Sequence, residues 1–349
     1  MTLKSDPGNF FEDFVVGDEL IHATPRTVTE ADVALYTGLT GSRFALYSAD
    51  TFAQDVGLPS SPIDPLLVFH VVFGKTVPDI SLNAVANLGY ADGRFFAPVF
   101  PGDTLRAVSE VIGVKENSNG KTGVVYIRTR GYNQEDDEVL NYVRWVMVNK
   151  KDPSHPAPVT VVPDLPKAVD PRELPERGYD LANYNFVLAG SPFAFEDYEI
   201  GEKIDHIDGV TVEEAEHQIA TRLYQNTAKV HFNQYAQRQT PRGKRLIYGG
   251  VAISLARSMA FNGLANAAEI IAINAGSHVN PLAAGDTVFA WSEVLDKVDL
   301  GGGLGALRLR LVATRNLPCA EFPYKDAEGK YLTEVILDFD YWAAIPNRG

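Results

Sequence analysis

One internal duplication restricts the fold of this chain more than any other feature of its sequence. The segment Leu39–Tyr47 (LTGSRFALY) returns in altered form as Leu223–His231 (LYQNTAKVH), 184 residues later. The flanking sequence repeats at the same interval, so that Phe11-Glu-Asp-Phe returns as Phe195-Glu-Asp-Tyr. A period this long indicates a duplicated domain rather than a solenoid repeat. Two copies of one scaffold are expected, and a chemical difference between them points to the site.

Each copy is predicted to hold one long buried helix followed by an antiparallel sheet. Asp64 and Pro65 suit an N-cap and a first helical position, and the run that follows is apolar on every face. Its counterpart begins at Ile247-Tyr-Gly-Gly. Short helices over 29–36 and 213–220 precede the two nine-residue segments, which are expected on loops. Gly-Asp turns at 102–103 and 285–286 are followed by apolar alternation that predicts strands up to 111 and 294. Two more strands are predicted in each copy, over 124–130 and 139–148 and over 306–314 and 335–344.

The domain organisation follows from these patterns. Residues 1–150 and 191–349 are predicted as two α+β units, each a sheet curled round its own buried helix. Residues 151–190 contain seven prolines and are predicted as a stiff, extended linker. His22 and His206 occupy equivalent positions in both copies, which favours a structural role for them. His70 lies in the apolar helix and is expected to be a core histidine.

Composition excludes several classes of function. The formal net charge of −14 argues against nucleic acid as a partner. The single cysteine, Cys319, excludes an internal disulfide and a cysteine-based metal site. No apolar run approaches the length of a membrane span, and no leader pattern is visible, so a cytoplasmic protein without a membrane partner is expected. No metal-ligand spacing, nucleotide loop or nucleophile elbow is present, so no metal or cofactor is expected.

Several motifs resemble the MaoC-like hydratase and dehydratase family, whose motif is close to Thr-Gly-Asp-x-Asn-Pro-Leu-His. The first copy matches it at Thr40, Gly41 and Leu46, and the second at Leu223, Val230 and His231. The Gly-Asp-Thr turns at 102–104 and 285–287 match as well. The resemblance implies a tandem double hot dog, in which each long helix is wrapped by a curved antiparallel sheet. The family aspartate is replaced by Ser42 in one copy and by Asn226 in the other.

Longer segments are similar to the mesaconyl-CoA hydratase branch of that family. They cover residues 7–14, 69–79, 224–231 and 246–250. This resemblance implies a hydro-lyase that reversibly hydrates a short branched carboxylated enoyl-CoA, mesaconyl-C1-CoA, to β-methylmalyl-CoA during acetate or glyoxylate assimilation. The expected partner is a CoA thioester, with CoA as part of the substrate, and a homodimer is a further option.

The difference between the copies places the reaction in the second one, because Tyr47 corresponds to His231. Histidine can serve as base or acid near neutral pH, as hydration of an enoyl thioester requires. Asn226 is a candidate for holding water or for fixing the imidazole of His231. Gly250 is a candidate for binding the thioester oxygen through its backbone N–H. Asp64 is first an N-cap and second a replacement for the missing acid. Each of these residues also has a purely structural interpretation.

Arginines and a lysine supply candidate anion sites. Arg238, Arg242, Lys244 and Arg245 precede the glycine pair and are candidates for binding the phosphates of CoA, or else form an ordinary charged loop. Arg43 and Arg94 are candidates for binding the free carboxylate of the acyl group, because a guanidinium matches a carboxylate in geometry. Two other functions remain open: a non-catalytic acyl-CoA-binding module and an acyl-CoA thioesterase.

Overall fold

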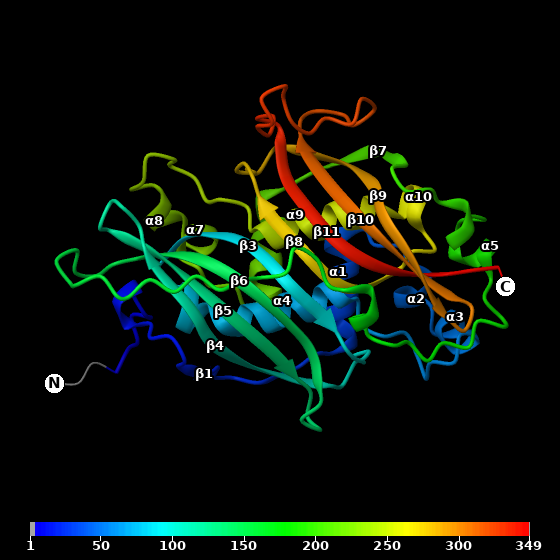
Figure 1. Cartoon of the computed structure of the whole chain (residues 1–349), viewed down its shortest axis with the longest axis horizontal. Coiled ribbons are helices and arrows are strands. Elements are labelled where there is room, and N and C mark those ends of the chain that lie inside the picture. Colours follow the sequence, from blue (N-terminus) through cyan, green and yellow to red (C-terminus); the bar gives the residue numbers. More distant parts are fainter. Residues whose placement is uncertain (1–3, 349) are drawn as a thin grey trace.

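The computed structural model describes residues 4–348 and places all strands in one antiparallel sheet (Figure 1). The first half contributes β1 (Glu19–Ile21), β2 (Arg26–Thr27), β3 (Ala84–Phe95), β4 (Thr104–Glu116), β5 (Thr122–Tyr132) and β6 (Glu138–Asn149). The second half contributes β7 (Lys203–Thr211), β8 (Glu269–His278), β9 (Thr287–Gly301), β10 (Leu304–Arg315) and β11 (Val335–Pro346). The order is β1-β4-β5-β6-β3-β8-β11-β10-β9-β7, with β2 beside β4, so the second half repeats the first in reverse.

Strands β3 and β8 join the two halves, with Tyr90 opposite Gly276 and Arg94 opposite Ala272. Strands β1, β2 and β7 were not predicted from the sequence, so the predicted sheets began only at β4 and β9, and β3 and β8 were not predicted either. Their segments are rich in Ala, Gly and Asn, which have low strand propensity. They also lie in the middle of the sheet, where a strand loses the alternation that marks a half-exposed one. The six strands that the sequence did predict are confirmed with shifted ends.

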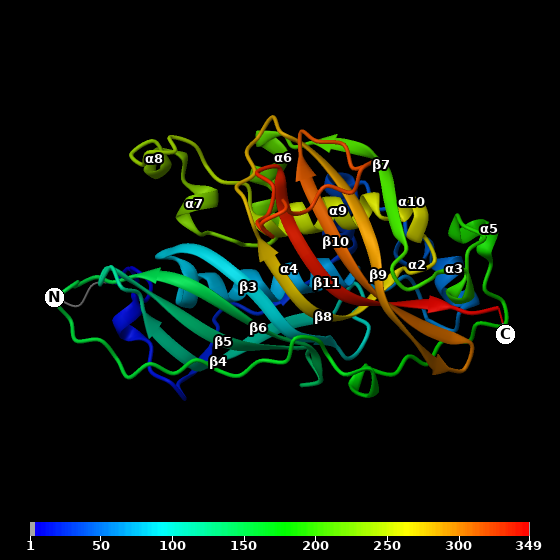
Figure 2. The ribbon, with the colours of Figure 1, turned by 45° about the horizontal axis from the view of Figure 1, so that its top comes forward.

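The two long helices lie against the inner face of the sheet (Figure 2). Helix α4 (Pro65–Thr76) is buried at all twelve positions, and the carboxylate of Asp64 caps it by accepting a hydrogen bond from Leu66 N at 2.8 Å. Helix α9 (Gly249–Met259) is its counterpart. The helices meet where His70 Nε2 lies 2.9 Å from Ser254 Oγ. Both predicted buried helices are confirmed, and the protein has the double hot-dog fold.

Shorter helices complete each copy. The predicted helices at 29–36 and 213–220 are present as α1 (Glu30–Thr40) and α6 (Glu214–Leu223). After them come α2 (Ala45–Ser48) and α3 (Asp50–Asp55) in the first copy, and α7 (Lys229–Phe232) and α8 (Gln234–Gln237) in the second. Helices α5 (Phe186–Ala189) and α10 (Phe261–Leu264) and the short turns Phe11–Asp13, Val77–Ser81, Pro171–Glu173 and Phe195–Asp197 make up the rest.

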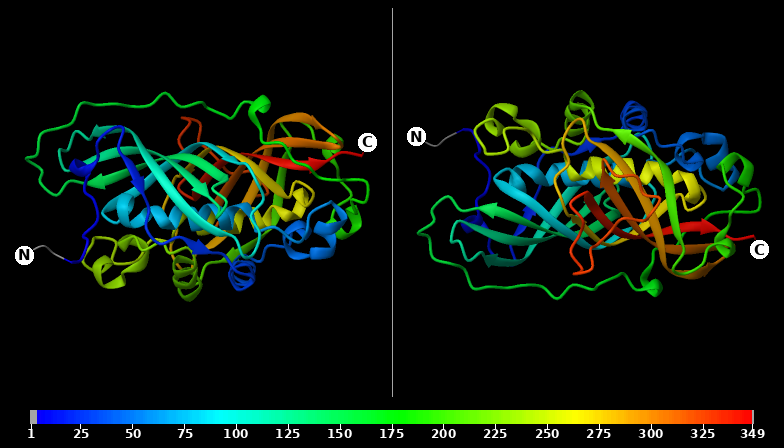
Figure 3. Two further views of the ribbon diagram at one scale, coloured as in Figure 1. Left: turned by 90° about the horizontal axis from the view of Figure 1, so that it is seen from below. Right: turned by 90° about the horizontal axis from the view of Figure 1, so that it is seen from above.

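The proline-rich segment is extended, and it also packs on the protein. It runs the length of the molecule on the side of the sheet opposite the helices (Figure 3). Val161 forms a bridge with Val114, and Val169 is buried against Trp342, whose indole N–H donates to Val169 O at 3.3 Å. The segment therefore covers the outer face of both sheet halves. No helix within residues 4–348 is long and apolar enough to cross a bilayer.

Candidate active site

A cavity of about 250 Å³ lies at the junction of the two copies. The first copy supplies the C-terminal end of α4 and parts of β3 and β6, and the second supplies α7, the start of α9 and the end of β8. The wall is apolar for the most part, with a set of polar side chains that converge on it: Ser81, Asn87, Tyr90, Arg144, Asn226, His231, Arg242, Tyr248, His278 and Asn280. Such a lining is typical of a small-molecule site.

His231 has the geometry of a neutral general base. It lies in the one-turn helix α7, where a loop was expected, and its Nδ1 is 2.9 Å from Leu246 O. A carbonyl oxygen only accepts hydrogen bonds, so Nδ1 carries the proton and Nε2 presents a lone pair. Burial lowers the pKa of His231 to about 4, which keeps the imidazole neutral at pH 7. The ring lines the cavity, as expected for this residue.

Asn226 also lines the cavity and is almost fully buried. Its Oδ1 accepts a hydrogen bond from Ala228 N at 3.2 Å, which orients the amide. Its Nδ2 has no partner within residues 4–348 and can donate to a water molecule or a substrate oxygen. Of the two roles considered for Asn226, fixing the imidazole is wrong, because Leu246 O does this. Holding water stays a prediction.

His278 is a second cavity histidine, and it was not predicted from the sequence. Its Nε2 lies 3.2 Å from the hydroxyl of Tyr90, which comes from the first copy. Burial lowers the pKa of His278 to about 4. The signal was available, because Phe95 stands three residues before Pro98 and His278 stands three residues before Pro281. His278 is therefore a second position at which the copies differ in chemistry.

Gly249 lines the cavity, whereas Gly250 is not among its lining residues. The role of the Gly250 backbone N–H stays a prediction. A Cβ on Gly249 would lie 2.2 Å from Cε1 of His278, so the helix start and the imidazole are in close contact. A Cβ on Gly250 would instead meet Tyr248 and His70 at 2.4 and 2.5 Å, which makes Gly250 a helix-packing residue. The first amides of a helix have no carbonyl partner within it, so the N–H groups at the start of α9 can bind an oxygen anion.

Asp64 lies away from the cavity, and the structure corrects its assignment as a substitute acid. It faces Tyr36, Phe44 and Tyr47 in a crevice of about 10 Å³ at the other end of the helix pair. Phe44 is buried there under the guanidinium of Arg257, which lies 4.1 Å from the ring centroid. Burial raises the pKa of Asp64 to about 6. The space equivalent to the cavity is thus filled by side chains in the first copy.

The four residues of the predicted basic cluster have different surroundings in the structure. The side chain of Arg242 is exposed and lines the cavity. Arg245 is engaged elsewhere, since its Nη2 lies 3.0 Å from Glu214 Oε1. Arg238 and Lys244 are exposed and do not line the cavity. Within the predicted cluster, Arg242 is therefore the member placed to meet a bound ligand.

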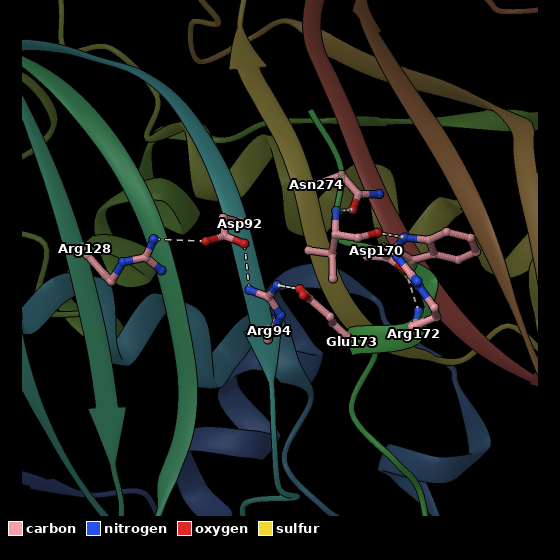
Figure 4. A network of polar contacts seen from close by, with 9 residues as sticks. Asp92, Arg94, Arg128, Asp170, Arg172, Glu173 and Asn274 are labelled. Atoms are coloured by element: carbon pink, nitrogen blue, oxygen red, sulfur yellow. Dashed lines mark hydrogen bonds and ion pairs between the residues drawn. The ribbon is translucent and has the colours of Figure 1, made fainter. Parts of the chain in front are cut away.

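Arg43 and Arg94 do not line the cavity, which corrects their placement near the acyl group. Arg43 is exposed, with its guanidinium 4.8 Å from the centroid of Phe261. Arg94 lies on the outer side of the sheet, with Nη1 2.6 Å from Asp92 Oδ1 and Nη2 2.6 Å from Glu173 Oε2 (Figure 4). Its donors tie the proline-rich segment to β3 and are occupied.

The histidines set aside as structural are buried and bonded within the protein. Nε2 of His22 lies 2.7 Å from Ser109 Oγ, and Nε2 of His206 lies 2.8 Å from Ser292 Oγ. His70 is fully buried at the contact between the long helices. The buried positions of His22, His206 and His70 thus agree with the structural roles predicted for them.

Known proteins resemble this chain over its whole length. A family model described as mesaconyl-CoA hydratase matches residues 2–173. The chain is 62% identical over 352 residues to β-methylmalyl-CoA dehydratase of Chloroflexus aurantiacus, covering all of both chains. It is 58% identical over 348 residues to mesaconyl-CoA hydratase of Cereibacter sphaeroides, covering 99% of this chain and 100% of that one.

Solved structures share the fold. A MaoC domain protein dehydratase from Chloroflexus aurantiacus superposes with a TM-score of 0.97 at 62% identity, over 100% of both chains. A Mycobacterium tuberculosis protein described as a double hot-dog fold superposes with a TM-score of 0.77 at 24% identity, over 97% of this chain and 98% of that one, which shows the fold alone. With a family model over its first half and two relatives well above half identical over its full length, this chain belongs to the mesaconyl-CoA hydratase family of MaoC-like proteins.

Proposed function

We propose that this protein is a hydro-lyase that reversibly adds water to mesaconyl-C1-CoA and forms β-methylmalyl-CoA. The observation that carries the proposal is the full-length identity of 62% and 58% to two relatives named for these two compounds. The cavity supports it independently, because a neutral histidine, an amide and a helix start converge there. No cofactor is needed for this reaction, since the thioester itself activates the double bond.

The chemistry divides among the cavity residues. His231 Nε2 takes a proton from water, whose oxygen bonds to the β-carbon of the enoyl group. The π electrons move toward the thioester oxygen, where the N–H groups at the start of α9 stabilise the developing negative charge. The α-carbon then takes a proton from the His278–Tyr90 pair, and the proton on His231 returns to that pair through the solvent of the cavity. Asn226 Nδ2 holds the attacking water toward the β-carbon.

The CoA part of the substrate is assigned to the side of the cavity that carries Arg242. This arginine is exposed, so its charge can meet phosphates at the surface, with Lys244 as a second contact. Contacts to a remote phosphate bind substrate and transition state equally, so they affect KM more than kcat. Replacement of Arg242 by Ala is expected to raise KM for the CoA thioester and to leave a pantetheine thioester, which lacks those phosphates, unaffected.

Incubation with mesaconyl-CoA tests the reaction. Loss of the enoyl absorbance with an intact thioester is expected. Release of free thiol would instead indicate a thioesterase, and binding without chemical change would indicate an acyl-CoA-binding module. Either of those two results would overturn the proposal.

The setting of the enzyme is part of the same proposal. A role in acetate or glyoxylate assimilation and a cytoplasmic location suit a soluble substrate of this kind. The acidic net charge of −14 supports the absence of a nucleic-acid partner. A homodimer is compatible with this assignment, and size-exclusion chromatography with light scattering measures the mass directly.

A further inference from the structure

The cavity contains a buried arginine without an anionic partner. Arg144 lies on β6 and is 0% exposed, and it lines the cavity. Its Nη2 donates to Thr76 Oγ1 at 2.8 Å, and Ser81 Oγ lies at 3.5 Å from the same atom. Within residues 4–348, Nε and Nη1 have no hydrogen-bond partner, and the structure pairs no Asp or Glu with this side chain. Two of the three guanidinium nitrogens are thus unsatisfied by the described residues.

This arrangement is costly for the unliganded protein. Removing a charge from water has a desolvation cost that an oppositely charged or hydrogen-bonding partner must offset. Buried arginines are therefore almost always paired. The ring of Phe73, 4.2 Å below the guanidinium, offers a favourable face but no hydrogen-bond acceptor. The protein maintains this unpaired cation at the cavity wall, which is expected if an anion from the ligand completes it.

Arg144 lies close to the groups that are proposed to carry out the reaction. It is the direct cross-strand partner of Tyr90, so both side chains project from the same face of the sheet. Tyr90 in turn contacts His278, which touches the start of α9. Arg144 is therefore deep in the cavity beside the catalytic groups, whereas the exposed Arg242 serves the surface side.

We propose that Arg144 binds the free carboxylate of the acyl group and so sets the preference for a carboxylated enoyl-CoA. This inference rests on the proposed function, in which the carboxylate is attached to the carbon that receives the hydroxyl group. Within the described part of the chain both hydrogens of Nη1 are without an acceptor, and Nη2 donates to one neighbour at 2.8 Å, so the end of the guanidinium can present charge-assisted donors to the carboxylate. Arg144 replaces Arg43 and Arg94, whose donors lie outside the cavity.

The kinetic test compares two substrates of the same shape. Mesaconyl-C1-CoA carries a carboxylate where tiglyl-CoA, its E-configured analogue, carries a methyl group. In Arg144→Met, kcat/KM for mesaconyl-CoA is expected to fall about 100-fold or more, as for loss of one partner of a buried charge pair. The value for tiglyl-CoA is expected to stay within a few-fold of the parent. Arg94→Met and Arg43→Met are matched controls and are expected to keep the preference of the parent.

A binding measurement separates this inference from the proposed reaction. Methylsuccinyl-CoA and 2-methylbutanoyl-CoA are saturated counterparts of the two substrates and cannot be hydrated. Calorimetry is expected to show that the parent prefers methylsuccinyl-CoA and that Arg144→Met abolishes this preference. That result would support the role of Arg144 even if mesaconyl-CoA were not hydrated. A parent that hydrates mesaconyl-CoA while Arg144→Met keeps the preference would overturn the role of Arg144 alone.

Folding is the remaining control. Met fills a similar volume against Phe73 without a charge, so the melting temperature of ligand-free Arg144→Met is expected to equal or exceed that of the parent. A parallel loss of activity on both substrates would assign Arg144 a structural role and overturn the inference. If Arg144→Met does not fold, Arg144→Lys is the test: it keeps the charge and loses the planar fork, and the preference is expected to narrow about tenfold. An unchanged preference in Arg144→Lys contradicts the inference.

Discussion

His70 Nε2 lies 2.9 Å from Ser254 Oγ, and these residues are separated by 184 positions, the interval between the two copies. Equivalent positions of a duplicated domain can touch only at the pseudo-twofold axis that relates the copies. The axis therefore passes between α4 and α9, and each end of the helix pair offers room for one site. One end holds the cavity with His231, and the other is filled around Tyr47 and Asp64.

Replacement of His231 by Gln is expected to lower kcat about 10²–10⁴-fold, because the base that takes the proton from water is lost. The melting temperature is expected to change little, since the amide of Gln can still donate to Leu246 O. Steady-state hydration of mesaconyl-CoA measures the effect. The control is Tyr47→Phe at the equivalent position of the first copy, where the buried hydroxyl has no hydrogen-bond partner among residues 4–348. Near-normal kcat in His231→Gln would place the reaction elsewhere.

His278→Phe copies the residue that the first copy has at this position. Hydration is expected to slow by about 10²-fold, because the proton donor to the α-carbon is removed. Tyr90→Phe leaves the imidazole in place and is expected to have a smaller effect. Exchange of the α-proton of β-methylmalyl-CoA with deuterated solvent reports on this step directly. Unchanged exchange in His278→Phe would exclude the residue from proton transfer.

The two glycines at the start of α9 are expected to fail in different ways. In Gly249→Ala, the new methyl group would displace the His278 ring from 2.2 Å, so kcat should fall while the melting temperature is nearly kept. In Gly250→Ala, the methyl group would collide with Tyr248 and His70 in the core, which is expected to cost about 1–3 kcal/mol of stability. Kinetics and thermal melting of both variants decide the matter. A loss of kcat in Gly250→Ala together with a loss of stability in Gly249→Ala would instead place the catalytic N–H at Gly250.

The buried histidines predict that stability falls as the pH decreases from 7 to 5. Burial lowers the pKa of His70 and His217 to about 3 and that of His206 to about 4, against 6.5 for an ordinary histidine. Between these values the unfolded chain binds more protons than the folded one. Each histidine therefore lowers the free energy of unfolding by up to about 1.4 kcal/mol per pH unit as the pH falls through this window.

Asp64 acts in the opposite direction, because burial raises its pKa from 3.8 to about 6 and the folded state binds the extra proton in that range. Three histidines outweigh one carboxyl group, so the net loss remains. Urea unfolding at pH 7 and pH 5 measures the difference, and Asp64→Asn is expected to make it larger. Equal free energies of unfolding at the two pH values would contradict the prediction.

The sequence alone determined the duplication, the buried helices and the position of His231. These features are local: an apolar run, an Asp-Pro cap and a motif are each read within a few residues of the chain. Aligning the two copies also revealed that Tyr47 and His231 occupy equivalent positions, because each copy can be compared residue by residue with the other. The same comparison would have found His278 against Phe95 had strands β3 and β8 been recognised.

Tertiary structure alone decided which distant residues share the cavity. Arg144 and Tyr90 meet through strand register, and Tyr90 meets His278 across the junction of the copies, over sequence separations that no local pattern encodes. The tertiary structure also places Asp64, Arg43 and Arg94 outside the cavity. The physical reason is that a local pattern fixes which face of an element is buried, whereas the packing of one continuous curved sheet on a pair of helices fixes what that face meets.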